Sequence, residues 1–221
     1  MGFAFDTFIF DLDGTILNTM PDLMLYTNMT MQHFDMPEHS YEAVQSFVGN
    51  GAKALVYQAV PEGTPERVAD AALAYWKGLF DSVGPRDTAP YPGVVETLEA
   101  LRAQGCKLAV LSNKFDRGTQ LTIETYLPGL FHAVHGESEA TPRKPDPTGL
   151  LYTMRELDSS AETTLYVGDS PGDMLTALRA GTAAAAVSWG YHPPQRLVDE
   201  GAHIVLERFD QLLEYAVNAD A

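Results

Sequence analysis

The 221-residue sequence contains little positive charge. Lys and Arg together number 14 against 30 Asp and Glu, which gives a formal net charge of −16 at pH 7. Nucleic acids and anionic membranes are bound through basic surface, so neither is expected as a partner. Residues 1–52 contain no Lys or Arg, which argues against a secretory signal or an Arg-rich transit peptide. We therefore expect a cytoplasmic protein.

Cysteine and long apolar runs are also scarce. The single cysteine, Cys106, cannot form an intramolecular disulfide, and its place before an apolar run predicts a small residue at the edge of the core. Six histidines are scattered without a His-x-x-x-His pair or a companion cysteine, so a zinc site is not expected. No stretch approaches the roughly 18 apolar residues that a membrane span needs. The apolar share of 45% is that of an ordinary globular chain.

Short apolar runs predict the strands of a buried parallel sheet. They lie at 8–10, 108–111, 165–167, 184–187 and 204–206. Helical patterns at 94–104 and 174–180 lie between the later runs, and each is followed by a glycine that favours helix termination. Alternation of strands and helices from residue 91 onwards predicts a Rossmann-like α/β core.

The segment at 17–89 departs from this alternation. It shows helical patterns at 20–34, 41–48, 52–60 and 65–79, and no convincing strand. We therefore predict a core formed by 1–16 and 90–221, with an all-helical domain at 17–89 inserted after the first strand.

The strongest local motif is Asp-Leu-Asp-Gly-Thr at 11–15, directly after the first predicted strand. Residues two apart on a strand face the same side, so Asp11 and Asp13 project together from its carboxyl end. That end is where open α/β sheets place their binding sites. Two neighbouring carboxylates either hold a cation or leave one carboxyl protonated, and an ordinary Asp-Gly turn would also explain the motif.

Three further strand ends or loops carry polar groups. Ser112 and Asn113 follow the second strand and can donate to phosphate oxygens, although an ordinary loop also begins this way. Lys144 lies in a proline-bounded segment that a solvated basic loop would equally explain. Asp169 follows another buried strand. A capping box from Ser170 to Asp173 accounts for those two residues but not for Asp169.

Together these groups describe a site for phosphoryl transfer. A divalent ion held by Asp11, Asp13 and Asp169, beside a lysine and a hydroxyl, would suit that chemistry. An all-oxygen ligand set favours Mg²⁺ over zinc or copper. The sequence has no Walker loop and no dinucleotide fingerprint.

The sequence resembles the haloacid dehalogenase-like hydrolases over essentially its whole length. Four motifs match in order: those at 11–15, 111–113, 144–147 and 168–174. The resemblance implies that the helical insertion is a cap over the site. A carboxylate at Asp13, which true dehalogenases lack, favours the phosphatases of the family.

The resemblance also assigns roles to the site residues. Asp11 would attack phosphorus and form an aspartyl-phosphate, Asp13 would act as general acid and base, and Lys144 would offset negative charge. Ser112 and Asn113 would hold phosphate oxygens.

The same resemblance implies a Mg²⁺ site. The Asp11 side chain, the Asp13 backbone carbonyl and Asp169 would hold the ion, with Asp173 as an outer carboxylate.

The substrate is expected to be a small phosphorylated metabolite such as 2-phosphoglycolate. The segment at 47–53 resembles the cap loop of phosphoglycolate phosphatases, and it makes Gly49, Asn50, Gly51 and Lys53 candidate substrate contacts. Lys53 could pair with a substrate carboxylate or could simply be a solvated lysine. Asn18-Thr19, where relatives commonly carry Asp-Ser, departs from that branch.

Other activities keep the same site and remain open. They are hydrolysis of pyrophosphate, a sugar phosphate or a nucleotide, and phosphomutase activity. Outside enzymes, the alternative is a catalytically idle binding protein. A monomer or a homodimer is expected.

Overall fold

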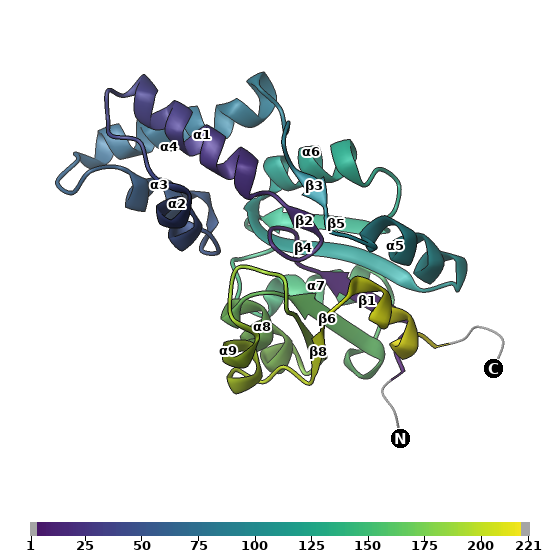
Figure 1. Ribbon diagram of the computed structural model, residues 1–221. Coiled ribbons are helices and arrows are strands. Elements are labelled where there is room, and N and C mark those ends of the chain that lie inside the picture. Colours follow the sequence, from purple (N-terminus) through teal and green to yellow (C-terminus); the bar gives the residue numbers. More distant parts are fainter. Residues whose placement is uncertain (1–3, 218–221) are drawn as a thin grey trace.

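The computed structural model describes residues 4–217, and its central feature is a six-stranded parallel sheet in the order β5-β4-β1-β6-β7-β8 (Figure 1). The strands are β1 (Thr7–Phe10), β4 (Lys107–Phe115), β5 (Ala133–Glu137), β6 (Thr164–Gly168), β7 (Ala183–Val187) and β8 (Ile204–Leu206). This confirms the predicted Rossmann-like α/β core.

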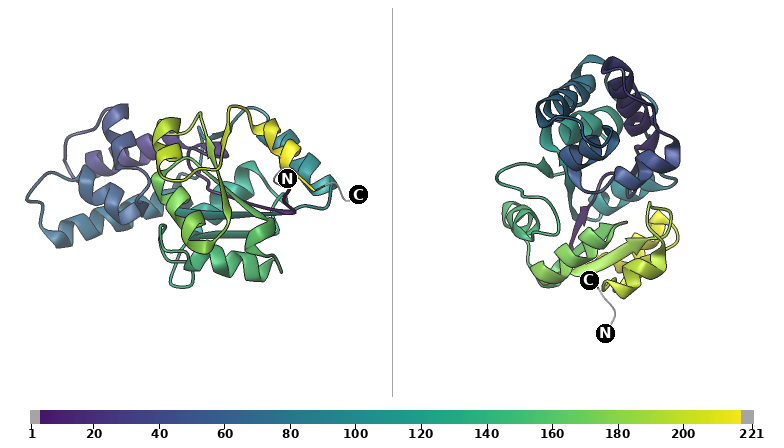
Figure 2. Two further views of the ribbon diagram at one scale, coloured as in Figure 1. Left: turned by 90° about the horizontal axis from the view of Figure 1, so that it is seen from below. Right: turned by 90° about the vertical axis from the view of Figure 1, so that its left-hand side faces the viewer.

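Helices cover both faces of the sheet (Figure 2). On one face lie α5 (Val94–Ala103), α6 (Asp116–Tyr126) and the 3₁₀ segment η2 (Phe209–Tyr215). On the other lie α7 (Thr148–Glu156), α8 (Pro171–Ala180) and α9 (Pro194–Asp199). A further 3₁₀ turn, η1 (Ala161–Thr163), leads into β6.

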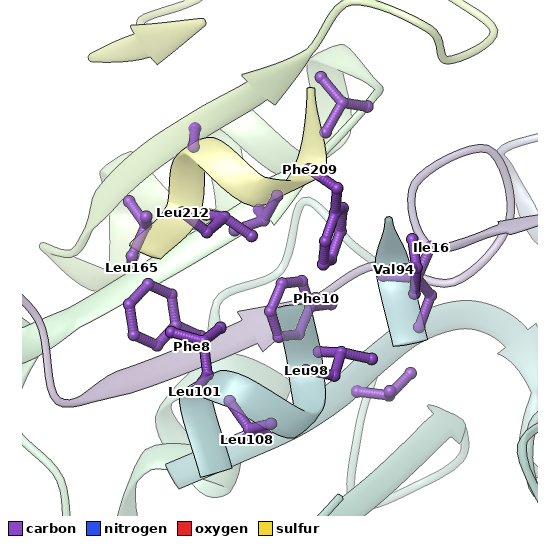
Figure 3. Close-up of a cluster of buried hydrophobic side chains, with 14 of the residues drawn as sticks. Phe8, Phe10, Ile16, Val94, Leu98, Leu101, Leu108, Leu165, Phe209 and Leu212 are labelled. Atoms are coloured by element: carbon purple, nitrogen blue, oxygen red, sulfur yellow. The ribbon is translucent and has the colours of Figure 1, made fainter. Parts of the chain in front are cut away.

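Strand β1 is the buried centre of the sheet and pairs in parallel with β4 and β6. Its side chains alternate between the faces, so Phe8 and Phe10 pack toward α5 and η2 while Ile9 belongs to the opposite cluster (Figure 3). Phe10 stacks on Phe209 with ring centroids 5.7 Å apart. Packing on both faces fixes the point where β1 ends and the first polar motif begins.

The helices α1 to α4 form a separate group beside one end of the sheet (Figure 1). Their bounds are Met20–His33 for α1, Tyr41–Phe47 for α2, Gly51–Ala59 for α3 and Glu66–Ser82 for α4. Their own apolar core centres on Tyr26, Trp76 and Phe80. Phe115, at the end of β4, packs edge-on against Phe80 at 5.0 Å and so joins this group to the sheet.

Two short strands connect the helical group to the core, where the sequence predicted none. β2 (Leu17–Asn18) and β3 (Ala89–Pro90) pair antiparallel at the two junctions. Each has two residues, too few to show an alternating pattern. No helix within residues 4–217 is both long and apolar enough to cross a membrane.

Two strands of the sheet also differ from the sequence-based prediction, one in its length and one in its presence. β4 continues through Phe115, beyond the predicted end at residue 111. β5 was not predicted because its residues, Ala-Val-His-Gly-Glu, form no apolar run, and it lies at the edge of the sheet.

Candidate active site

The carboxyl ends of β1, β4 and β6 meet at a pocket closed on one side by the helical group. From the core, the pocket is lined by Asp11, Asp13, Ser112, Asn113, Lys114, Lys144, Asp169, Ser170, Tyr191 and His192. From the helical group, it is lined by Leu23, Val48, Gly49, Gly51, Ala52, Leu55 and Trp76. The cavity has a volume of about 50 Å³. One wall is therefore ionic and the other mainly apolar.

Asp11 is the first residue after β1, and its side chain is almost fully buried. Its backbone N–H donates to the Val167 carbonyl at 2.9 Å, which extends the β1–β6 pairing by one residue. Burial raises the pKa of Asp11 to about 6, and the neighbouring Asp173 adds to the rise while Lys144 opposes it. The Lys144 ammonium lies 2.8 Å from Asp11 Oδ1.

Lys144 is a buried cation next to Asp11. Its Nζ also lies 2.7 Å from Asp173 Oδ1 and donates to the Leu111 carbonyl at 3.3 Å. Burial alone would lower the pKa of Lys144, but the adjacent Asp11 and Asp173 raise it well above its usual value. The lysine is therefore charged throughout the physiological range.

Asp173 is fully buried, and its oxygens already accept hydrogen bonds from several groups. Oδ2 accepts from the Ser170 hydroxyl at 2.7 Å, from the Ser170 N–H at 2.9 Å and from the Asp169 N–H at 3.2 Å. Oδ1 accepts from Lys144 and from the Tyr166 hydroxyl. Ser170 also receives the Asp173 N–H, which confirms the predicted capping box at the start of α8. Asp173 therefore orients Lys144 and the Asp169 backbone.

Asp169 follows β6 and is held between two glycines. Oδ2 accepts the Tyr191 N–H at 2.7 Å. A Cβ at Gly190 would lie 2.2 Å from Asp169 Cβ, and one at Gly14 would lie 2.5 Å from Oδ2, so neither position has room for a side chain. Burial, together with Asp173 and Asp11, raises the pKa of Asp169 well above its usual value.

Asp11, Asp169 and Asp173 form a buried acidic cluster that could hold a divalent metal. One oxygen of each lies within 4.8 Å of the others. Lys144 pairs with Asp11 and Asp173, so among the described residues these three buried carboxylates share one ammonium. The residues therefore fit a cation. Because the Asp173 oxygens are already engaged, Asp11 and Asp169 are the better ligands.

The Asp13 side chain is not part of this cluster. Its Oδ1 accepts the Thr19 hydroxyl at 2.6 Å and the Lys114 ammonium at 2.9 Å. Lys114 was not among the predicted site residues. The signal that points to it is its place in Asn-Lys-Phe at 113–115, in a chain with only 14 basic residues.

Ser112 and Asn113 are both in the pocket but are engaged differently. The Ser112 hydroxyl accepts the Lys114 N–H at 3.3 Å and keeps its own proton available for a ligand. The Asn113 amide donates to the Gly49 carbonyl at 2.8 Å, and its oxygen accepts the Lys144 N–H at 2.7 Å. The Asn113 side chain therefore ties the helical group and the Lys144 loop to β4.

The predicted substrate loop is only partly in the pocket. Gly49 and Gly51 line it, and Gly51 approaches the core so closely that a Cβ there would lie 2.5 Å from Glu137 Oε2. Asn50 and Lys53 are not among the lining residues that the structure describes. Lys53 is exposed, with its ammonium 4.9 Å from the Tyr57 ring centroid.

Comparison with known proteins places these features in a family. The sequence model described as haloacid dehalogenase-like hydrolase matches residues 8–187. Phosphoglycolate phosphatase 1 of Pseudomonas aeruginosa is 34% identical over 218 residues, which cover 96% of this chain and 79% of that protein. Phosphoglycolate phosphatase of Mannheimia succiniciproducens is 33% identical over 213 residues, which cover 93% and 95%.

Solved structures show the same architecture. The crystal structure of a predicted phosphoglycolate phosphatase from Haemophilus somnus aligns with a TM-score of 0.87 at 29% identity, covering 95% of this chain and 97% of that one. One from Lactobacillus delbrueckii aligns with a TM-score of 0.86 at 28% identity, covering 96% and 98%.

Proposed function

The chain belongs to the haloacid dehalogenase-like hydrolase family and is a phosphatase, and from this premise we propose that it hydrolyses a small phosphate monoester through an aspartyl-phosphate at Asp11. The observation that carries the proposal is the Asp11 carboxylate at the end of β1, next to the Lys144 ammonium and a buried acidic cluster. A carboxylate beside a fixed cation is suited to attack on an anionic phosphoryl group.

The proposed reaction has two displacements. An Asp11 oxygen attacks phosphorus, the bond from phosphorus to the ester oxygen breaks, and Asp13 gives that oxygen its proton. Water then attacks the phosphorus of the aspartyl-phosphate, Asp13 takes a proton from it, and inorganic phosphate leaves Asp11. Ser112 donates to a phosphoryl oxygen, and Lys144 offsets charge on Asp11 and the phosphoryl group.

We propose Mg²⁺ as the cation of this site. Asp11 and Asp169 would hold it through their carboxylates, and the Asp13 backbone carbonyl would be a third ligand, with Asp173 outside them. When bound, the ion supplies charge stabilisation for the phosphoryl oxygens. The hard oxygen donors of these residues favour it over softer metals.

As the substrate we propose a short phosphorylated metabolite of the 2-phosphoglycolate type. A cavity of about 50 Å³ is far smaller than the roughly 300–1,000 Å³ of pockets for drug-sized ligands, which favours a small leaving group over a nucleoside. The curated relatives named above carry the name phosphoglycolate phosphatase. We further propose a cytoplasmic protein, monomeric or homodimeric, that binds neither nucleic acid nor membrane.

Phosphate release from a panel of esters tests the proposal. The panel holds 2-phosphoglycolate, pyrophosphate, a hexose phosphate, a nucleoside monophosphate and an aryl phosphate, each assayed with Mg²⁺ and with chelator. We expect Mg²⁺-dependent turnover that favours 2-phosphoglycolate, and none from Asp11→Asn. Retained activity in Asp11→Asn would refute the assignment of Asp11 as the nucleophile. A preference for another member of the panel would refute 2-phosphoglycolate as the substrate.

A further inference from the structure

The pocket contains one lysine that the proposed chemistry does not use. Lys114 lies two residues beyond Ser112 on β4, and only 4% of its side-chain surface is exposed. A buried ammonium is costly without a defined partner. Its recorded contacts among residues 4–217 are the Asp13 carboxylate at 2.9 Å and the Phe80 ring, whose centroid is 5.2 Å away.

The other cations near the pocket are already paired with carboxylates of the protein. Lys144 is shared between Asp11, Asp173 and a backbone carbonyl. Arg143 approaches the loop at Gly51, but its Nε and one terminal nitrogen both donate to Glu137 Oε1. Lys114 and Lys144 are the only Lys or Arg side chains among the described residues that line the pocket.

Lys114 still has donors available. An ammonium carries three N–H groups, and Asp13 Oδ1 is the one hydrogen-bond acceptor recorded for it in the described part of the chain. Asp13 is also held by the Thr19 hydroxyl at 2.6 Å, so it keeps a fixed partner if the ammonium is shared. The Lys114 ammonium can therefore donate a hydrogen bond to a second anion while it keeps its contact with Asp13.

The position of Lys114 relative to the leaving group follows from Asp13. A general acid must lie within about 3.2 Å of the ester oxygen that it protonates. Because Asp13 Oδ1 accepts from both Thr19 and Lys114, the other carboxylate oxygen is the one that would carry the proton, and the ammonium then lies within about 8 Å of the ester oxygen. A carboxylate separated from the ester oxygen by one carbon can lie between the two. The opposite wall, formed by Leu23, Leu55 and Trp76, offers it no charge.

We propose that Lys114 binds the carboxylate of the substrate and thereby selects phosphate esters that carry a second anion next to the ester carbon. This inference rests on the proposed function and names the residue that gives it specificity. In this proposal Lys114 binds the substrate carboxylate, and the exposed Lys53 does not. Lys114 acts as a binding residue and takes no part in the displacements.

The test compares two substrates of nearly equal size, 2-phosphoglycolate and 2-hydroxyethyl phosphate, in which a hydroxymethyl group replaces the carboxylate. Charge-assisted hydrogen bonds predict that Lys114→Met raises KM for 2-phosphoglycolate about 10- to 150-fold. Because Lys114 also contacts Asp13, any loss of kcat should be common to both substrates, and the rise in KM for 2-hydroxyethyl phosphate should be about tenfold smaller than that for 2-phosphoglycolate. A role confined to positioning Asp13 or packing on Phe80 would impair both substrates alike and would overturn the inference.

Two further variants provide controls. Lys77→Met removes a lysine that lies 5.2 Å from the Phe115 ring centroid but does not line the pocket, and it should leave both substrates unaffected. Lys53→Met tests the competing assignment. A selective rise in KM for 2-phosphoglycolate in Lys53→Met, with none in Lys114→Met, would give the role to Lys53.

The wild-type protein supplies a measurement that does not depend on the folding of any variant. Its KM for 2-phosphoglycolate should be at least tenfold below that for 2-hydroxyethyl phosphate, and equal values would contradict the inference. If the wild type hydrolyses no phosphate ester, the proposed function itself fails. If it hydrolyses 2-phosphoglycolate and Lys114→Met is unaffected, only the role of Lys114 fails.

Discussion

Asp11 should destabilise the metal-free protein because its carboxyl group is buried. A buried carboxyl is harder to ionise when folded than when unfolded, so its ionisation favours unfolding. The pKa of Asp11 rises from the ordinary 3.8 to about 6, a difference that corresponds at 1.36 kcal/mol per pKa unit to about 3 kcal/mol. We therefore predict that Asp11→Asn, which removes the charge and keeps the shape, raises the free energy of unfolding in chelator at pH 8.

The pH dependence follows from the direction of the shift. Between pH 3.8 and 6 the folded protein binds more protons at Asp11 than the unfolded chain does, so the wild type loses stability as pH rises through this range. Above pH 6 the loss is complete, and below 3.8 it vanishes. The gain in the free energy of unfolding of Asp11→Asn over the wild type should therefore be full at pH 8 and about half as large at pH 5.

Denaturant unfolding of both proteins at pH 5 and pH 8, in chelator, measures this difference. Glu139→Gln, which removes an exposed carboxylate, is the matched control and should show no comparable gain. Added Mg²⁺ should narrow the gap, because it binds the folded wild type more strongly. If Asp11→Asn were less stable than the wild type at pH 8, the reasoning would be refuted. The ion pair between Asp11 and Lys144 would then stabilise the folded protein by more than burial of the ionised Asp11 destabilises it.

Three further predictions concern the rest of the site. Asp13→Asn should lower kcat for an alkyl phosphate about 10²- to 10⁴-fold and for an aryl phosphate with an acidic leaving group much less, and equal losses would exclude it as general acid. Lys144→Met should abolish turnover and lower the free energy of unfolding by about 3–5 kcal/mol, because it leaves Asp11 and Asp173 without their cation; denaturant unfolding decides. Gly51→Ala should raise KM through its clash with Glu137. Gly63→Ala, at a similar φ of +82° against +79° but with nothing nearby, should not, and a KM change common to both would point to backbone strain instead.

The sequence located the acidic site because parallel strands bring their carboxyl ends to one edge. Asp11 and Asp169 each directly follow a buried strand, and β1 pairs with β6 residue by residue, so their proximity follows from the topology. The Ser170–Asp173 capping box is equally local, since a cap depends on residues three apart.

The role of Lys114 could not be predicted in this way. Its partner Asp13 lies 101 residues away, and the pairing depends on β4 continuing past Ser112. The direction of the Lys53 side chain also depends on the tertiary structure, so the sequence could not predict it. A lysine in the first turn of a helix can point in several outward directions, and here the Lys53 ammonium lies over the Tyr57 ring. Strand β5 lacked an apolar run, so its membership of the sheet depended on pairing with β4.

The central claim is that the Asp11 carboxylate forms a covalent bond to the transferred phosphoryl group. Rapid acid quench of the wild type, turning over a ³²P-labelled phosphate ester with Mg²⁺, followed by peptide mapping, tests it most directly. We predict a hydroxylamine-sensitive label on the peptide that contains Asp11, formed within one turnover and absent from Asp11→Asn. Turnover without protein-bound label, or label on another residue, would contradict the account.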